Sequence, residues 1–185
     1  MSKIGLREVK LINWYGFINE NIPLSENMTL ITGENESGKS TILDAIKYAY
    51  TGDYKFNEAT SKNNTGNGKR NLVSYTRCLL DPSAGIYARP ADKMPSVFTH
   101  IALEYYDEIN QNSFVLGVVL ETAAADIKTS EWYAAEKKTL KDLDFTYEEK
   151  GQEKPYDASD FQKKNGLKLK NKKDGITLFM QMTGL

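Results

Sequence analysis

Residues 28–42 are MTLITGENESGKSTI, a short apolar run followed by a glycine-rich loop and the start of an apolar helix pattern. Residues 33–40 fit the phosphate-loop pattern G-x-x-x-x-G-K-[ST] at every fixed position. Glycines let the backbone curl so that successive N–H groups point at one phosphate, and the following helix adds its positive dipole end. The pattern therefore predicts a binding site for a nucleoside triphosphate.

The predicted phosphate contacts come from one stretch of chain: Gly33, Asn35, Glu36, Ser37, Gly38, Lys39, Ser40 and Thr41. Lys39 would reach the β- and γ-phosphates, and the Ser40 hydroxyl would ligate Mg²⁺. Thr41 can give a further hydroxyl and amide on the α-phosphate side. Glu36 occupies a variable loop position, and the pattern gives it no role of its own.

Composition sets the broad class of protein. The 185 residues are 40% hydrophobic, which suits one globular domain with a substantial core. The net charge of −1 does not favour a nucleic-acid partner, so any such surface would be a local patch. The single cysteine, Cys78, cannot form an intramolecular disulfide. The sequence shows no secretory signal and no apolar run of about 20 residues, so we expect a cytoplasmic protein without a membrane partner.

Apolar periodicity predicts a mixed α/β fold. The expected strands are 3–14, 16–24, 28–32, 96–107, 112–122 and 130–137, with 96–122 forming an antiparallel hairpin around the turn at 108–111. The expected helices are 39–50 with a stop at Gly52, a short helix in 71–80, a short helix after Thr139, 157–166, and 176–184. Residues 53–70 and 81–95 are predicted to be surface loops.

The class of nucleotide protein is a separate question. Residues 171–174 match the guanine-reading pattern N-K-x-D, but they follow a lysine-alternating segment rather than a buried strand. We interpret that match as accidental. A small-molecule kinase would fit the chain length, although neither its lid arginines nor its acceptor-site acid can be identified. An ATPase needs an acid at the end of a second buried strand. Asp107-Glu108 is the nearest match, and we interpret this pair as turn residues.

Residues 11–53, LINWYGFINENIPLSENMTLITGENESGKSTILDAIKYAYTGD, resemble the N-terminal head segment of the SMC-like ATPases, the group that includes MukB, SbcC and RecF-type proteins. Residues 12–15 (INWY), 70–80 (RNLVSYTRCLL) and, more faintly, 131–145 are similar to one branch. That branch is the MksF/JetC subunit of the condensin-like Wadjet systems, which act against plasmids. The resemblance is specific over residues 8–52, moderate over 69–80 and weak beyond.

The resemblance implies a fold and a setting. The fold would be an α/β P-loop NTPase of the ABC/SMC head type, with residues 1–185 forming an N-terminal lobe that has a mixed sheet and an antiparallel hairpin subdomain. The ligands would be ATP and Mg²⁺, sandwiched between two heads of a homodimer. Walker B and the signature motif would come from a C-terminal lobe of the same protein, which is absent here. DNA and kleisin-type accessory subunits would be further partners, and this segment alone would be inactive.

Several other residues are candidates for contacts with nucleotide or DNA, and each could instead have a purely structural role. Trp14 or Tyr15 could stack on adenine or could close the hairpin as core aromatics. Arg70 and Arg77 could contact nucleotide or DNA, or could be solvated or salt-bridged. A lysine-rich segment could follow a DNA backbone or could be a solvated charge run: Lys163, Lys164, Lys168 and Lys170. His100 has no second ligand at metal spacing, and we interpret it as structural.

Two functional classes besides the head segment stay open. A self-contained P-loop enzyme, a kinase or a GTPase, would turn over nucleotide or select guanine with this chain alone. A nucleotide-sensing interaction module would bind ATP without turnover, even with a C-terminal lobe supplied.

Overall fold

The computed structural model describes residues 3–25, 29, 31–32, 38–54, 71–124 and 126–184. Its centre is a five-stranded sheet in the order β2-β1-β5-β6-β7. The strands are β1 (Ile4–Trp14), β2 (Phe17–Pro23), β5 (Ser96–Asp107), β6 (Asn112–Ala123) and β7 (Asp126–Glu136). Two smaller hairpins pair β3 (Leu79–Asp81) with β4 (Ile86–Tyr87), and β8 (Thr146–Glu149) with β9 (Gln152–Pro155).

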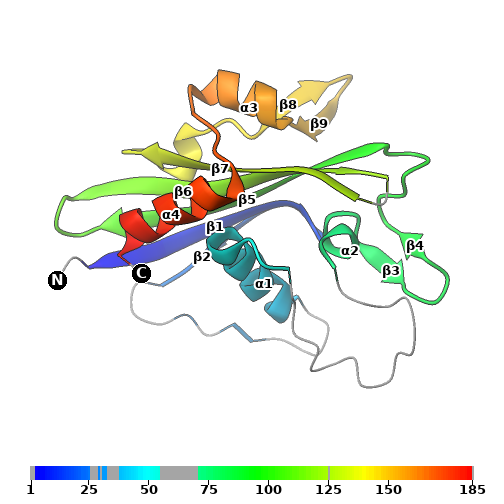
Figure 1. The fold of residues 1–185 in the computed structure, drawn as a ribbon, viewed down its shortest axis with the longest axis horizontal. Helices are drawn as coiled ribbons and strands as arrows, with labels where there is room; N and C mark the ends of the chain where they lie inside the picture. Colours follow the sequence, from blue (N-terminus) through cyan, green and yellow to red (C-terminus); the bar gives the residue numbers. More distant parts are fainter. Residues whose placement is uncertain are drawn as a thin grey trace.

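The sheet separates two layers of other elements (Figure 1). On one face lie α1 (Lys39–Thr51), α2 (Leu72–Thr76) and α4 (Lys172–Thr183), whose side chains share one core with that face. On the opposite face lie the short 3₁₀ helix η2 (Leu140–Asp142), the β8–β9 hairpin and α3 (Ala158–Asn165), drawn above the sheet in Figure 1. Because both faces are covered, side chains of both parities along the central strands are buried.

Every strand pairing in the described part of the chain is antiparallel, and this corrects the expectation of a mixed sheet. Short turns join β5 to β6 and β6 to β7, and such turns allow only antiparallel neighbours. The β5–β6 hairpin is also not a separate subdomain, because β1 pairs with β5 along the centre of the sheet. Of the predicted strand at 28–32, residues 29, 31 and 32 lie outside any strand, and residues 28 and 30 lie outside the described residues.

The two cores follow the alternation of the strands. Along β5, Ile101 and Leu103 pack into the core under α1, whereas His100 and Ala102 face the core under α3. β1 departs from this alternation at its end, because Asn13 has a left-handed backbone (φ 52°). Trp14 therefore lies in the same core as Val9 and Leu11, on the side of α1.

Helix ends agree well with the sequence signals. α1 ends at Gly52, which adopts φ 58° and donates its N–H to the Tyr48 carbonyl (2.7 Å). α3 begins after Asp157, whose side chain accepts from the Asp160 N–H, and it ends at Gly166 in a left-handed conformation. The predicted final helix is confirmed but begins earlier, at Lys172.

Two hairpins fall where no strand was predicted. In β8–β9 the turn residues Lys150 and Gly151 both have positive φ (51° and 75°), which is the backbone of a type I′ turn. The lysine-glycine pair was the available sequence signal. The β3–β4 hairpin begins at Leu79, inside the segment 71–80 that was expected to hold a helix, and continues into the expected loop, with Gly85 at φ 64° in its turn.

His100 is buried in the core under α3. Its Nε2 lies 2.8 Å from the Tyr156 carbonyl oxygen, and its ring contacts Phe145 and Phe161. Burial lowers the pKa of the imidazole to about 4. The contacts agree with a structural role, and no cluster of three His, Cys, Asp or Glu side chains suited to a metal occurs in the described residues.

We expect His100 to make folding stability depend on pH. Because the unfolded imidazole takes up a proton near pH 6.5 and the folded one only near 4, the unfolded state binds more protons between these values. The free energy of unfolding should therefore fall as the pH drops through this window, by up to about 3 kcal/mol. Urea unfolding of the wild type and of His100→Gln from pH 7.5 to 4.5 measures the difference. Parallel pH profiles for the two proteins would contradict this assignment.

Candidate nucleotide-binding site

The described part of the predicted phosphate loop is the start of α1. Gly38 precedes the helix with φ 90°, and a Cβ at this position would lie 3.4 Å from Phe17 Cζ. Lys39 is half-buried, Ser40 is exposed and Thr41 is buried. The Ser40 hydroxyl is therefore at the surface, where an Mg²⁺ ion carried by a phosphate group could reach it. The other predicted contacts lie outside the described residues: Gly33, Asn35, Glu36 and Ser37.

The first turn of α1 differs from the first turns of α3 and α4. Within the described residues, no side chain caps the N-terminus of α1, and its first turn contains no acid. By contrast, Asp157 caps α3 and Asn171 caps α4, and each of those helices has an aspartate in its first turn. The first amides of a helix need acceptors, and its positive dipole end favours an anion. The start of α1 is thus suited to an external anion such as a phosphate.

Two buried tryptophans fix the position of α1. The indole N–H of Trp14 donates to the Thr41 carbonyl (2.8 Å), and that of Trp132 donates to the Ala49 carbonyl (2.9 Å). Both tryptophans are 0% exposed. Because Thr41 lies in the first turn and Ala49 in the last, the helix is attached to the sheet at both ends.

These contacts correct one of the two adenine candidates. Trp14 has no exposed ring face, since it packs against Tyr75 (ring centroids 4.8 Å apart) and Tyr48 (6.3 Å). It is a core aromatic that closes the hairpin. Tyr15 is 36% exposed, and its ring lies 5.8 Å from that of Tyr75. Tyr15 therefore stays a candidate for stacking on a base.

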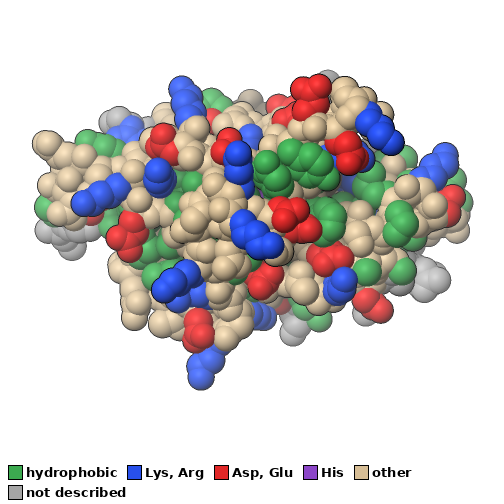
Figure 2. Space-filling model, turned by 90° about the horizontal axis from the view of Figure 1, so that it is seen from above, with side chains coloured by type: hydrophobic (Ala, Val, Ile, Leu, Met, Phe, Trp, Pro, Cys, Tyr) green, Lys and Arg blue, Asp and Glu red, His purple; other side chains and the backbone are tan. Residues whose placement is uncertain are grey.

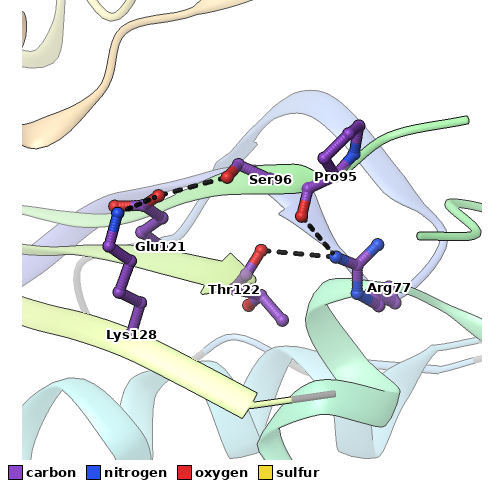
Figure 3. A network of polar contacts seen from close by, with 6 residues as sticks. All are labelled: Arg77, Pro95, Ser96, Glu121, Thr122 and Lys128. Atoms are coloured by element: carbon purple, nitrogen blue, oxygen red, sulfur yellow. Dashed lines mark hydrogen bonds and ion pairs between the residues drawn. The ribbon is translucent and has the colours of Figure 1, made fainter. Parts of the chain in front are cut away.

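Arg77 is also corrected, from a candidate ligand contact to a structural residue. Its side chain is buried, at 2% exposure, and its guanidinium donates only to backbone carbonyls among the described residues. Figure 3 shows two of these bonds, to Pro95 just before β5 and to Thr122 near the end of β6. Burial lowers the pKa of the guanidinium. Arg70, the companion candidate, lies outside the described residues.

The lysine-rich segment lies at the end of α3 and in the connection to α4. Lys163 and Lys164 occupy the last turn of α3, where a positive charge complements the helix dipole. Lys168 is exposed, and the Lys170 backbone pairs with Trp132 on β7. Seen from the α3 side, basic and acidic side chains are interspersed over this face (Figure 2). This mixture favours a solvated surface over a continuous basic track.

The acids at the end of β5 form a turn, as the sequence pattern indicated. The Asp107 carboxylate accepts from Asn110 Nδ2 (2.7 Å) and from the Ile109 N–H (2.9 Å), and these bonds lower its pKa. The Glu108 carboxylate forms an ion pair with the Lys3 ammonium group, with 3.1 Å between Nζ and Oε1. Both carboxylates are thus bonded at the turn and to the N-terminal segment. No helix in the described residues is long and apolar enough to cross a membrane.

Two residues that the sequence did not single out contribute to this region. Asp44 is buried on α1, and its carboxylate accepts from the Tyr75 hydroxyl at 2.5 Å. Arg89 is buried beside the β1–β2 turn, where its guanidinium binds backbone carbonyls. An isolated aspartate on a helix and an arginine before a proline carry no motif, so only the three-dimensional contacts reveal them.

The segment that contains the phosphate-loop pattern is similar to known proteins. Residues 6–63 match the family described as the P-loop containing region of AAA domain. The DNA replication and repair proteins RecF of Brucella abortus, Brucella suis and Brucella melitensis are each 32% identical to this chain over 51 residues. The aligned segment makes up 28% of this chain and 13% of each RecF protein. These similarities support a nucleotide-binding P-loop segment within residues 6–63.

Proposed function

We propose that this chain supplies the ATP·Mg²⁺-binding part of an SMC-like ATPase head. The observation that carries the proposal is the start of α1. A complete phosphate-loop pattern leads directly into a helix whose first turn is uncapped in the described structure, lacks an acid and begins with Lys39. The similarity of residues 6–63 to P-loop regions supports the same assignment.

The expected chemistry is phosphate binding rather than bond cleavage by this chain alone. The helix dipole and first amides attract the phosphates, and Lys39 adds a full positive charge next to the β- and γ-phosphates. Mg²⁺ needs few protein ligands when a substrate's phosphates supply the others, so the exposed Ser40 hydroxyl suffices as a contact on this chain. Hydrolysis would require the acids of a C-terminal lobe.

The wider setting is part of the proposal. ATP would bring two such heads together as a homodimer, each completed by its C-terminal lobe, in a DNA-acting complex with kleisin-type accessory subunits. The name of the RecF relatives, DNA replication and repair protein, supports a DNA-related role. The complex would extrude loops, restrict plasmids as the MksF/JetC resemblance implies, or act in repair as the name of the RecF relatives suggests.

The GTPase alternative has an observation against it. In the N-K-x-D match, Asn171 caps α4 by accepting from the Asp174 N–H (2.9 Å), and its Nδ2 donates to the Asp174 carboxylate (3.0 Å). The two side chains that would read guanine are therefore bonded to each other at a helix start. The nucleotide-sensing module makes the same binding prediction as the head segment, and only turnover after addition of the C-terminal lobe separates them.

We expect Lys39→Ala to abolish most ATP binding. The variant removes the charge next to the phosphates without changing the core, so the thermal stabilisation that saturating MgATP gives the wild type should be lost. Calorimetry and thermal unfolding with ATP and GTP provide the measurement, alongside an assay for released phosphate. Lys47→Ala, on the same helix about two turns later, is the matched control and should bind as the wild type does. Phosphate release by this chain alone would instead favour a self-contained enzyme.

We expect Asn171→Ala to lower stability without altering nucleotide choice. Loss of the cap should reduce the free energy of unfolding by about 1 kcal/mol. The relative affinity for ATP and GTP should stay the same, because Asn171 caps α4 and, in this proposal, does not contact the nucleotide. Lys173→Ala, in the same turn, should change stability by less than about 0.5 kcal/mol. A selective loss of GTP affinity in Asn171→Ala would show that the N-K-x-D match is functional.

A further inference from the structure

Arg89 occupies an unusual position for a buried cation. It is 8% exposed, and no ion pair involving it occurs among the described residues. Its Nε donates to the Asn13 side-chain oxygen (3.1 Å), Nη1 donates to the carbonyls of Tyr15 (3.0 Å) and Thr76 (3.1 Å), and Nη2 donates to those of Tyr15 (3.0 Å) and Phe17 (3.5 Å). The guanidinium thus binds the turn between β1 and β2 and joins it to the end of α2.

Residues 13–17 form the β1–β2 corner. This corner contacts the start of α1 at two points. The Trp14 indole donates to the Thr41 carbonyl, and the Phe17 ring lies against Gly38. Gly38 and Thr41 belong to the predicted phosphate site. The corner is therefore the part of the sheet that sets where the first turn of α1 lies.

The corner has a backbone that would relax without support. Asn13 and Tyr15 both adopt left-handed conformations, with φ of 52° and 49°. Asparagine tolerates this conformation, but it is unfavourable for tyrosine, where it persists because surrounding contacts over-determine it. The planar guanidinium of Arg89 supplies several of those contacts at once, and the single ammonium point of a lysine could not reproduce them.

We propose that Arg89 is a positioning residue for nucleotide binding, which acts by holding the β1–β2 corner against the start of α1. It touches no nucleotide itself. A first turn that is already fixed loses less freedom when a phosphate binds, so the support raises affinity. This inference rests on the proposed function, because it names what keeps that same site in place.

Arg77 provides a matched control within the same molecule. It is also buried and likewise donates to backbone carbonyls outside the corner, one of them that of Arg89 itself and the others those of Met94, Pro95 and Thr122. Arg77→Lys and Arg89→Lys therefore remove the same kind of network, and only the second network contacts the corner. Phe161→Leu, in the core under α3, is a second control for general loss of stability.

The indole N–H signals of the two tryptophans separate a local effect from a general loss of stability, because a general loss would change both signals. They are the only tryptophans in the chain, and their indole N–H groups bond to opposite ends of α1. In ¹⁵N-labelled protein without nucleotide, Arg89→Lys should shift the Trp14 indole signal and speed its hydrogen exchange, while the Trp132 signal stays in place. Arg77→Lys and Phe161→Leu should leave the difference between the two signals unchanged.

ATP affinity completes the test. Arg89→Lys should weaken MgATP binding about tenfold, the size of one lost bond to a charged group, whereas Phe161→Leu should retain wild-type affinity. Phe17→Leu keeps the guanidinium bonds but removes the ring from Gly38, and it should weaken binding in the same direction. This variant decides the matter if Arg89→Lys does not fold.

The possible outcomes are distinct. Equal affinity losses in Arg89→Lys and Phe161→Leu, or an unmoved Trp14 signal in Arg89→Lys, would overturn the positioning role. Wild-type affinity in Lys39→Ala would overturn the proposed function instead. The indole signals, recorded without nucleotide, would then still decide whether Arg89 fixes the start of α1.

Discussion

The fold depends on the need of two buried indole N–H groups for acceptors. A buried donor without a partner is costly, and both Trp14 and Trp132 find carbonyls on α1, at Thr41 and Ala49. The helix carrying the candidate site is therefore attached to β1 at one end and to β7 at the other. α4 closes over the second attachment, and it can approach only because residue 175 is a glycine, where a Cβ would lie 2.2 Å from Trp132 Cβ.

Local sequence signals predicted most of the fold on either side of this helix. The stop at Gly52, the cap at Asp157 and the β5–β6 hairpin need only neighbouring residues, so periodicity and turn chemistry revealed them. A mixed sheet was expected, whereas every strand pairing among the described residues is antiparallel, as the short turns between β5, β6 and β7 require. The side of the sheet that Trp14 occupies could not be predicted either, since one left-handed residue, Asn13, reverses the alternation.

The candidate site was predictable to a different extent. Lys39 and Ser40 belong to a motif whose spacing carries its own chemistry, and the structure places them at the start of α1 as expected. The two tryptophans that hold this helix lie 27 and 83 positions from their acceptors in the sequence and follow no pattern. Arg77 was selected for its charge, and its burial reverses that interpretation. Arg89, which no pattern singled out, makes the contacts that bear on the site.

Because Arg89 binds carbonyl oxygens, the pH and the salt concentration should have little effect on the conformation of the corner. A carbonyl oxygen does not titrate, whereas a carboxylate partner would be neutralised in acid. Buried bonds are also screened much less by dissolved salt than a surface ion pair. The support that Arg89 gives to the corner should thus be indifferent to acidity and ionic strength, while the attraction of phosphates to the first turn of α1 weakens as salt rises. Salt concentration should therefore weaken phosphate binding at the first turn of α1 and leave the Arg89 bonds that support this turn unchanged.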